Sequence, residues 1–76
     1  AAEQGAANAQ YNLALMYGNG DGVPQDHRAA HMWFNLAAAN GHENAVKGRD
    51  IAAGMMTPAD ISKAQQMASD WMKAHP

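Results

Sequence analysis

The sequence contains no cysteine, few charged residues and no long apolar run. Without cysteine, the chain forms no disulfide and offers no thiolate as a metal ligand or nucleophile. Its five lysine and arginine residues are scattered, so no basic patch is present to neutralise nucleic-acid phosphates. No segment approaches the ~20 apolar residues that a membrane-spanning helix requires. These absences predict a protein that binds neither nucleic acid nor membranes.

The residues that are present have the composition of a folded domain. The 76-residue chain is 47% apolar and 16% charged and carries a net charge of −2, which argues against disorder. A chain of this length forms one domain, whose core contributes only ~3–5 kcal/mol to stability.

A stretch near the N-terminus recurs 36 positions later. Residues 1–9 are similar to residues 37–45, so that Asn8, for example, recurs as Asn44. A period of this size is typical of helical repeats, which commonly form binding surfaces.

Small and apolar residues at helical spacing predict a first helix over residues 6–17. Gly18 is expected to end this helix in a left-handed conformation. Residues 19–24 contain Asn-Gly and Asp-Gly steps and a proline, and they predict a loop. The predicted core residues of the first helix are Ala9, Leu13, Met16 and Tyr17.

A second helix is predicted to run from an N-cap at Asp26 to Asn40, where Gly41 stops it. The helical wheel collects a core face of small and aromatic residues, namely Ala30, Trp33, Phe34, Ala37, Ala38 and Gly41.

Two further helices are predicted in the second half of the chain. One covers residues 44–53, and the other begins at a Thr57 cap followed by Pro58. The apolar stripe of this last helix consists of Ile61, Ala64, Ala68, Trp71 and Met72. The predicted fold is therefore all-α, an α-solenoid of about two antiparallel helix pairs.

These residues, taken together, resemble the Sel1-like repeat, a relative of the tetratricopeptide repeat. The resemblance is carried by Gly5, Ala9-Gln10, Leu13, Tyr17, Gly20-x-Gly22-Val23, Asp26, Ala30, Trp33-Phe34, Ala37-Ala38 and Gly41. It implies one Sel1-like repeat domain over residues 1–76: residues 1–5 end a preceding helix, 6–41 form a well-formed repeat, and 42–76 form a degenerate capping repeat. The last segment, Met56 to Trp71, is similar to the end of arrays of this family, which implies the C-terminal end of an array.

The resemblance also implies a non-catalytic scaffold without a cofactor, which binds a protein or peptide on the concave surface of the first helix of each pair. Opposite its predicted core, the first helix presents Asn8, Tyr11 and Leu15, and the 36-residue offset carries these positions onto Asn44, Lys47 and Ile51. A tyrosine beside amides and aliphatic side chains is typical of a binding hot spot. In the alternative interpretation, Leu15 and Ile51 pack under neighbouring helices.

His27 and His31 lie four residues apart on the predicted second helix. Both imidazoles therefore lie on one side of this helix and could bind a metal ion. No third ligand is close in sequence, and the favoured interpretation is a pair of partly buried structural histidines. No Gly-x-Ser-x-Gly motif is present, and the acidic residues form no close pair, so no enzyme is predicted.

Two other roles stay open. The segment can be a structural C-terminal cap without a partner of its own, or, more weakly, a histidine-based metal-binding module. An incomplete N-terminal repeat would leave apolar surface exposed, which predicts self-association.

Overall fold

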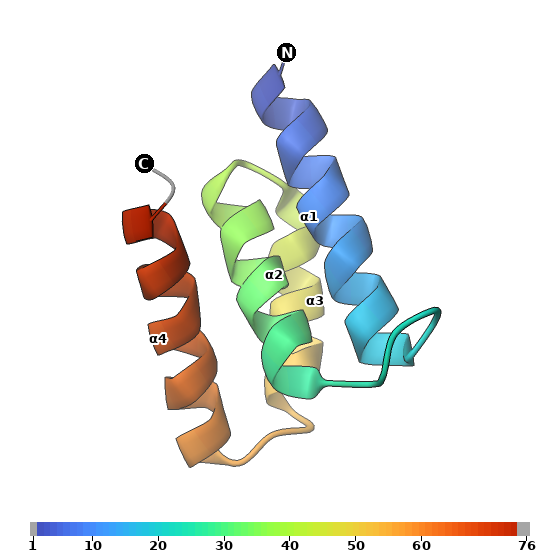
Figure 1. Ribbon diagram of the computed structural model, residues 1–76, viewed down its shortest axis with the longest axis vertical. Coiled ribbons are helices and arrows are strands. Elements are labelled where there is room, and N and C mark those ends of the chain that lie inside the picture. The colour runs from blue at the N-terminus through green and yellow to red at the C-terminus, as the bar shows by residue number, and fades with distance from the viewer. Residues whose placement is uncertain (1, 75–76) are drawn as a thin grey trace.

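The computed structural model describes residues 2–74, with side chains from Gly5 onward, and this part of the chain forms four α-helices. They are α1 (Ala2–Asn19), α2 (His27–Ala39), α3 (Glu43–Ala53) and α4 (Pro58–Ala74). Successive helices run in opposite directions along the long axis of the molecule (Figure 1). The predicted all-α fold with antiparallel neighbours is confirmed.

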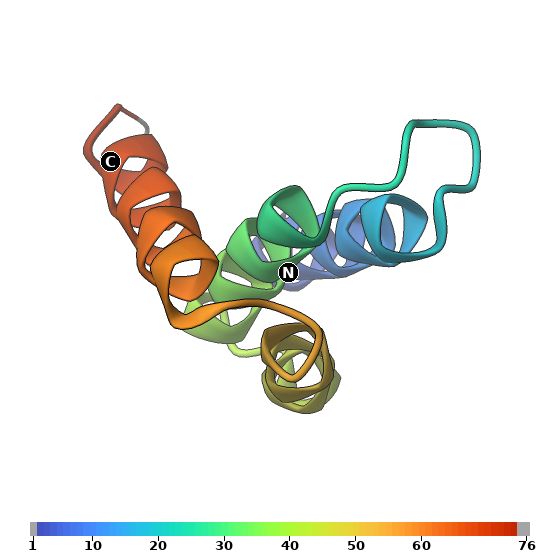
Figure 2. The same ribbon diagram turned by 90° about the horizontal axis from the view of Figure 1, so that it is seen from below.

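Helix α2 lies at the centre and packs against each of the other three helices (Figure 2). Phe34 of α2 is the large side chain of the main core cluster, and small residues surround it. Because the neighbours are alanines, the helix backbones approach α2 closely and the aromatic ring fills the remaining space. The buried residues of this cluster are Ala14, Ala30, Phe34, Ala37, Ala45 and Ala52.

The predicted helix ends at Asp26, Gly41 and Thr57 are confirmed. The Asp26 carboxylate accepts hydrogen bonds from the backbone N–H groups of residues 28 and 29 at 3.0 and 3.2 Å. Gly41, at φ +92°, ends α2, and the following N–H, that of His42, donates to the carbonyl of Ala37 at 3.0 Å. The Thr57 hydroxyl accepts from the N–H of residue 60 at 3.2 Å. These local signals determine where α2 and α4 begin and where α2 ends.

Both ends of α1 differ from the prediction. Residues 2–5, which were expected to end a preceding helix, form the beginning of α1, which continues unbroken to Asn19. Gly18 does not end the helix in a left-handed conformation. Gly20 takes that conformation instead, at φ +73°. Gly18 lies within α1, where a Cβ would lie 3.8 Å from that of Ala30, an ordinary van der Waals distance.

The buried face of α1 also differs from the prediction. Ala9 and Met16 are exposed, and Leu13 and Tyr17 are only half-buried. The buried positions are Ala7, Gln10 and Ala14. These residues are small or polar because α2 provides the large side chains of the core. The Gln10 side-chain oxygen accepts a 2.8 Å hydrogen bond from the Asn40 amide.

Helix α4 packs on α2 and lies apart from α1, as Figure 2 shows. Ala64 and Ala68 are buried in this contact, and the Trp71 ring meets the Trp33 ring edge-on at a centroid distance of 5.8 Å. Met72 was expected in the buried stripe but is exposed, because it lies over the opening between α3 and α4. The outer face of α4 is polar and exposed, with Ser62, Lys63, Gln66, Ser69, Asp70 and Lys73.

Candidate functional site

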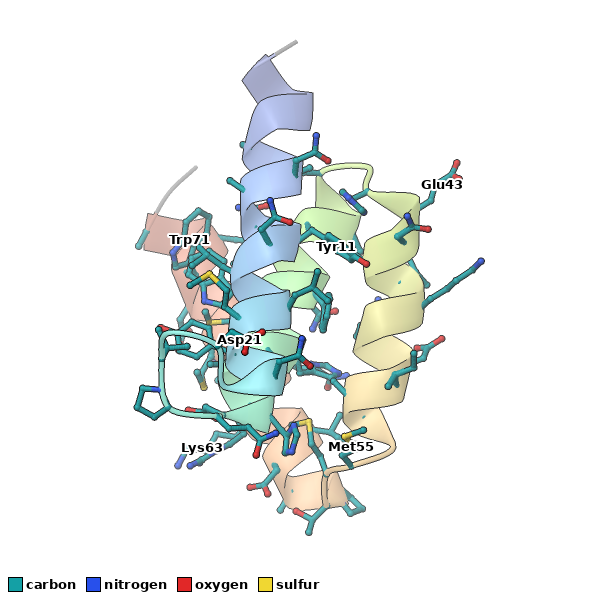
Figure 3. All side chains as sticks on the ribbon, turned by 90° about the vertical axis from the view of Figure 1, so that its right-hand side faces the viewer. Tyr11, Asp21, Glu43, Met55, Lys63 and Trp71 are labelled. Atoms are coloured by element: carbon teal, nitrogen blue, oxygen red, sulfur yellow. The ribbon has the colours of Figure 1, made fainter. Side chains whose placement is uncertain are left out.

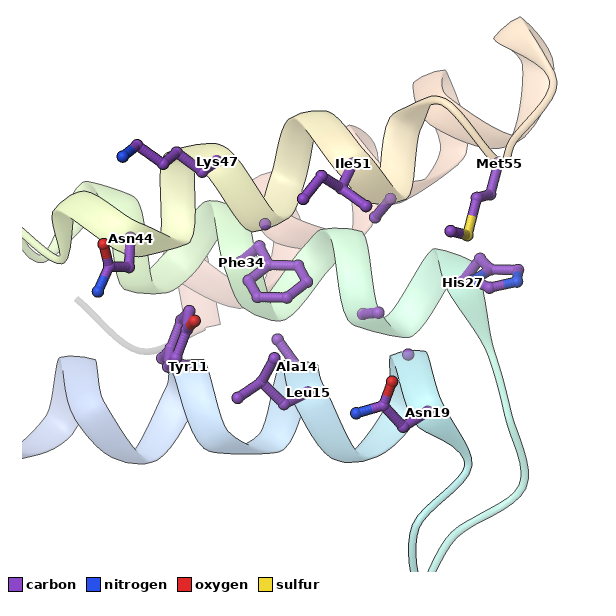
Figure 4. Close-up of a pocket in the computed structure, with 14 residues that line it drawn as sticks. Tyr11, Ala14, Leu15, Asn19, His27, Phe34, Asn44, Lys47, Ile51 and Met55 are labelled. Atoms are coloured by element: carbon purple, nitrogen blue, oxygen red, sulfur yellow. The ribbon is translucent and has the colours of Figure 1, made fainter.

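A groove runs between α1 and α3 and has α2 as its floor (Figure 3). Its volume is about 280 Å³, and it is open to solvent. Figure 4 shows α1 and α3 as its two walls, with the Phe34 ring between them at the bottom. The groove therefore lies on the surface that α1 and α3 share, the surface predicted for partner binding.

The floor of the groove is apolar and closely packed. Phe34 is buried, and its ring lies against the backbone of α3 at Gly48. A Cβ added at Gly48 would lie 2.5 Å from Cε1 of Phe34, so only glycine allows this contact without a shift of the ring or of the helix. Ala30 of α2 and Ala52 of α3 also line the groove. Gly48 thus holds α3 at the distance from α2 that the groove requires.

The walls carry three exposed apolar side chains. Leu15 on α1 is 37% exposed, Ile51 on α3 is 65% exposed, and Met55 in the turn after α3 is 62% exposed. Leu15 and Ile51 lie on opposite walls, on either side of the Phe34 ring (Figure 4). Within the described residues, neither Leu15 nor Ile51 is buried under a neighbouring helix. These side chains offer apolar surface at the mouth of a hollow, which marks interaction sites on many proteins.

Polar groups of the groove gather at its two ends (Figure 4). Tyr11, Asn44 and Lys47 lie at one end, and Asn19 and His27 lie at the other. The middle of the groove is lined by alanine, glycine and the large apolar residues alone.

Tyr11 belongs to both the groove and the core. Its ring meets the edge of Phe34 at a centroid distance of 5.7 Å and stacks on the His42 ring at 4.2 Å and 14°. These contacts hold α1 against the connection between α2 and α3, so Tyr11 stabilises the fold as well as lining the groove.

Five of the six predicted binding residues line this groove: Tyr11, Leu15, Asn44, Lys47 and Ile51. The sixth, Asn8, lies in a neighbouring hollow that Asn44 also lines. The offset of the repeat placed the two sets on facing helices because equivalent residues of two successive repeat units point in related directions.

Sequence reasoning did not assign Gly48, Met55 or His27 to this site. Met55 lies in the turn after α3, and its position four residues after Ile51 was a signal that it extends the same wall. Gly48 also carried a signal, because a glycine within a helix is unfavourable unless close packing requires it.

The two histidines of α2 have different surroundings. His27 lines the groove, whereas His31 is buried and its Nδ1 lies 3.4 Å from the side-chain nitrogen of Asn35. Asn35 in turn accepts a 3.4 Å hydrogen bond from Arg49. Burial lowers the pKa of His31, the positive charge of Arg49 lowers it further, and Asp50 partly opposes this change. Within residues 2–74, no group of three or more potential ligands could hold a metal ion.

The helices and the groove define the class of this protein, an all-α helical-repeat module in which paired helices share a concave surface. Residues 7–42 match the family model described as Sel1 repeat, and the resemblance seen in the sequence is thereby confirmed. This stretch is a Sel1 repeat, and Sel1 repeats generally serve as protein–protein interaction modules. No curated protein and no solved structure matches the chain. None of the helices in the described part is long and apolar enough to cross a membrane.

Proposed function

We propose that the chain is a non-catalytic interaction module that binds a segment of a partner protein in the groove between α1 and α3. The observation that carries this proposal is the pairing of exposed apolar residues, Leu15 and Ile51, across a hollow with a closed apolar floor. Monomeric proteins rarely expose apolar side chains around a concave site unless that site binds something.

The chemistry of the groove supports binding rather than a reaction. Its lining residues include no carboxylate, hydroxyl or thiol apart from the Tyr11 phenol. An imidazole is present at His27, but no nucleophile or second acid–base group lies beside it in the groove lining. These residues can provide apolar contact, amide hydrogen bonds and one lysine charge.

The test is a selection of random peptides on the immobilised chain, followed by affinity measurements with two variants. Ile51→Asp places a charge in the groove, and Val46→Asp is its matched control, because Val46 is a 39% exposed apolar residue on the same helix outside the groove. We expect selected peptides to bind at least tenfold more weakly to Ile51→Asp and unchanged to Val46→Asp. The proposal fails if no peptide is selected, or if both variants bind equally well.

Tyr11 requires a milder substitution, because Tyr11→Ala would remove two ring contacts of the fold. Tyr11→Phe keeps the ring and removes only the hydroxyl, and Lys47→Glu reverses the exposed charge at the same end of the groove. We expect the double variant to keep its helical content and melting temperature while its affinity for the selected peptides falls. Unchanged affinity would exclude this end of the groove from the site.

A second candidate, a structural cap of a longer array, is supported by the contrast between the two outer helices. The outer face of α4 is polar, whereas α1 leaves Ala9 and Met16 exposed. If the segment acts as a cap, a further helical repeat fused before α1 should raise the melting temperature, and one fused after α4 should not. Equal stabilisation at both ends would contradict the cap.

A further inference from the structure

We infer that the groove between α1 and α3 takes an amphipathic α-helix of the partner rather than an extended peptide, with an acidic residue placed against Lys47. This inference rests on the proposed function and specifies the conformation and charge of the bound segment.

The polarity of the groove carries the conformational part. An extended segment exposes its backbone N–H and C=O groups, and each group that loses water must find a partner. The middle of the groove offers none, because its lining residues there are Ala14, Leu15, Phe34, Gly48 and Ile51. The backbone groups of α1 and α3 are engaged within their own helices at these positions. A bound helix meets this requirement because its backbone groups are paired internally.

The dimensions of the groove agree with a short helix that inserts one face. From Asn44 to Ala52, the α3 wall spans about 12 Å at a rise of 1.5 Å per residue, which matches about two helical turns. A volume of about 280 Å³ does not hold a whole helix, but it holds large apolar side chains that project from one face. Side chains spaced three and four residues apart on a partner helix form such a row.

Lys47 determines the charge that fits. It is the one lysine, arginine or carboxylate residue among the lining residues, and no ion pair joins it to another residue in the part of the chain that the structure describes. Glu43 lies one turn earlier on α3 but lines the neighbouring hollow rather than the groove. An acidic side chain of the partner at the Tyr11 end therefore meets an unpaired cation, and a basic one meets repulsion.

The test uses three synthetic peptides of about 14 residues, the length of roughly four helical turns. The first has leucines at positions i, i+4, i+7 and i+11, alanine and glutamine elsewhere, and two glutamates at one end. The second has the same residues but a proline in place of the central alanine, which breaks the helix. The third has lysines in place of the glutamates. Binding to the whole chain is followed by isothermal titration calorimetry, and helix formation by circular dichroism.

We expect the first peptide to bind and to gain helicity on binding, the proline peptide to bind at least tenfold more weakly, and the lysine peptide at least threefold more weakly. The threefold preference for glutamate should disappear in Lys47→Gln, and Ile51→Asp should abolish binding of the first peptide. Equal binding of the proline peptide would overturn the helical conformation, and equal binding of the lysine peptide would overturn the acidic partner. Absence of binding by the first peptide would overturn the inference as a whole.

This outcome is separable from the failure of the proposed function. If the random selection yields peptides that contain proline, bind without gaining helicity and still require Ile51, then the groove is a binding site and the inferred helix is wrong. If the selection yields no peptide that requires Ile51, then the proposed function itself fails.

Discussion

The two walls of the groove, α1 and α3, occupy equivalent positions of the 36-residue repeat but bury different faces. Ala9 on α1 is exposed, and its counterpart Ala45 on α3 is completely buried against α2. Conversely, α1 buries Ala14, whereas the α3 counterpart, Asp50, is 72% exposed in its side chain. Helix α2 lies between α1 and α3. The two helices therefore contact α2 through opposite faces, and residues at equivalent repeat positions differ in burial.

This difference shows what the second repeat unit has lost. The face by which α1 packs on the next helix corresponds on α3 to Glu43, Val46 and Asp50, and all three are exposed. Only Val46 of these three residues is apolar, and α4 packs mainly on α2. The departure of the second unit from the repeat pattern is thus visible as the opening between α3 and α4.

The largest expected effect comes from removing the contact that both walls share. Phe34→Ala deletes the buried ring beneath the groove and should cost about 3–5 kcal/mol, which is comparable to the total stability expected for a domain of this size. We expect the variant to be largely unfolded at 25 °C, as measured by urea denaturation monitored by circular dichroism. A cooperative transition within about 1 kcal/mol of the parent chain would contradict the central role of this ring.

The second prediction compares two residues that hold equivalent repeat positions but differ in burial. Ala45→Leu inserts a large side chain into a filled core and should destabilise the chain by about 1–3 kcal/mol. Ala9→Leu makes the same chemical change at the equivalent exposed position, and the effect should stay within about 0.5 kcal/mol. If chemical denaturation gives equal losses for the two variants, the difference in burial between α1 and α3 is wrong.

The third prediction concerns two glycines with opposite surroundings. Gly48→Ala forces the Phe34 ring or α3 to move, and we expect a net loss of about 1–2 kcal/mol after the better helix propensity of alanine is included. Gly5→Ala on α1 meets no atom within 4 Å and should stabilise the chain by about 0.5–1 kcal/mol. Thermal unfolding of both variants measures the contrast, and stabilisation by both would show that Gly48 does not set the approach of α3.

The smallest expected effect is the contribution of His31 to the pH dependence of the free energy of unfolding. Its folded-state pKa lies below the ordinary value of 6.5, because burial and the Arg49 charge disfavour the charged imidazole. The unfolded chain therefore binds the proton more readily, so the contribution of His31 is complete above about pH 6.5 and is lost as the pH falls through the folded-state value. His31→Gln should flatten this decline in urea denaturation between pH 7 and pH 5. An unchanged slope would show that His31 does not cause it.

Local signals in the sequence predicted much of the fold. The caps at Asp26 and Thr57 and the stop at Gly41 depend on neighbouring backbone groups, so they could be read without tertiary information. The buried face of α1 could not be predicted from the sequence. Its buried positions carry alanine and glutamine, which a search for large apolar residues does not detect.

The candidate site was predicted in a similar, partial way. The repeat offset placed Leu15 and Ile51 on facing walls, because the offset reflects the geometry of successive units. The dual role of Tyr11 and the requirement for glycine at position 48 depend on contacts with Phe34 and His42 from other elements. Such contacts follow from packing rather than from spacing along the chain.

The most direct test of the account exploits the absence of cysteine from the chain. Ile51→Cys and Val46→Cys each provide one attachment point for a small trifluoromethyl tag, one inside the groove and one outside it on the same helix. On addition of a selected peptide, the ¹⁹F NMR signal at position 51 should shift, and the signal at position 46 should stay in place. A shift at position 46 without a shift at position 51 would place binding outside the groove and contradict the account.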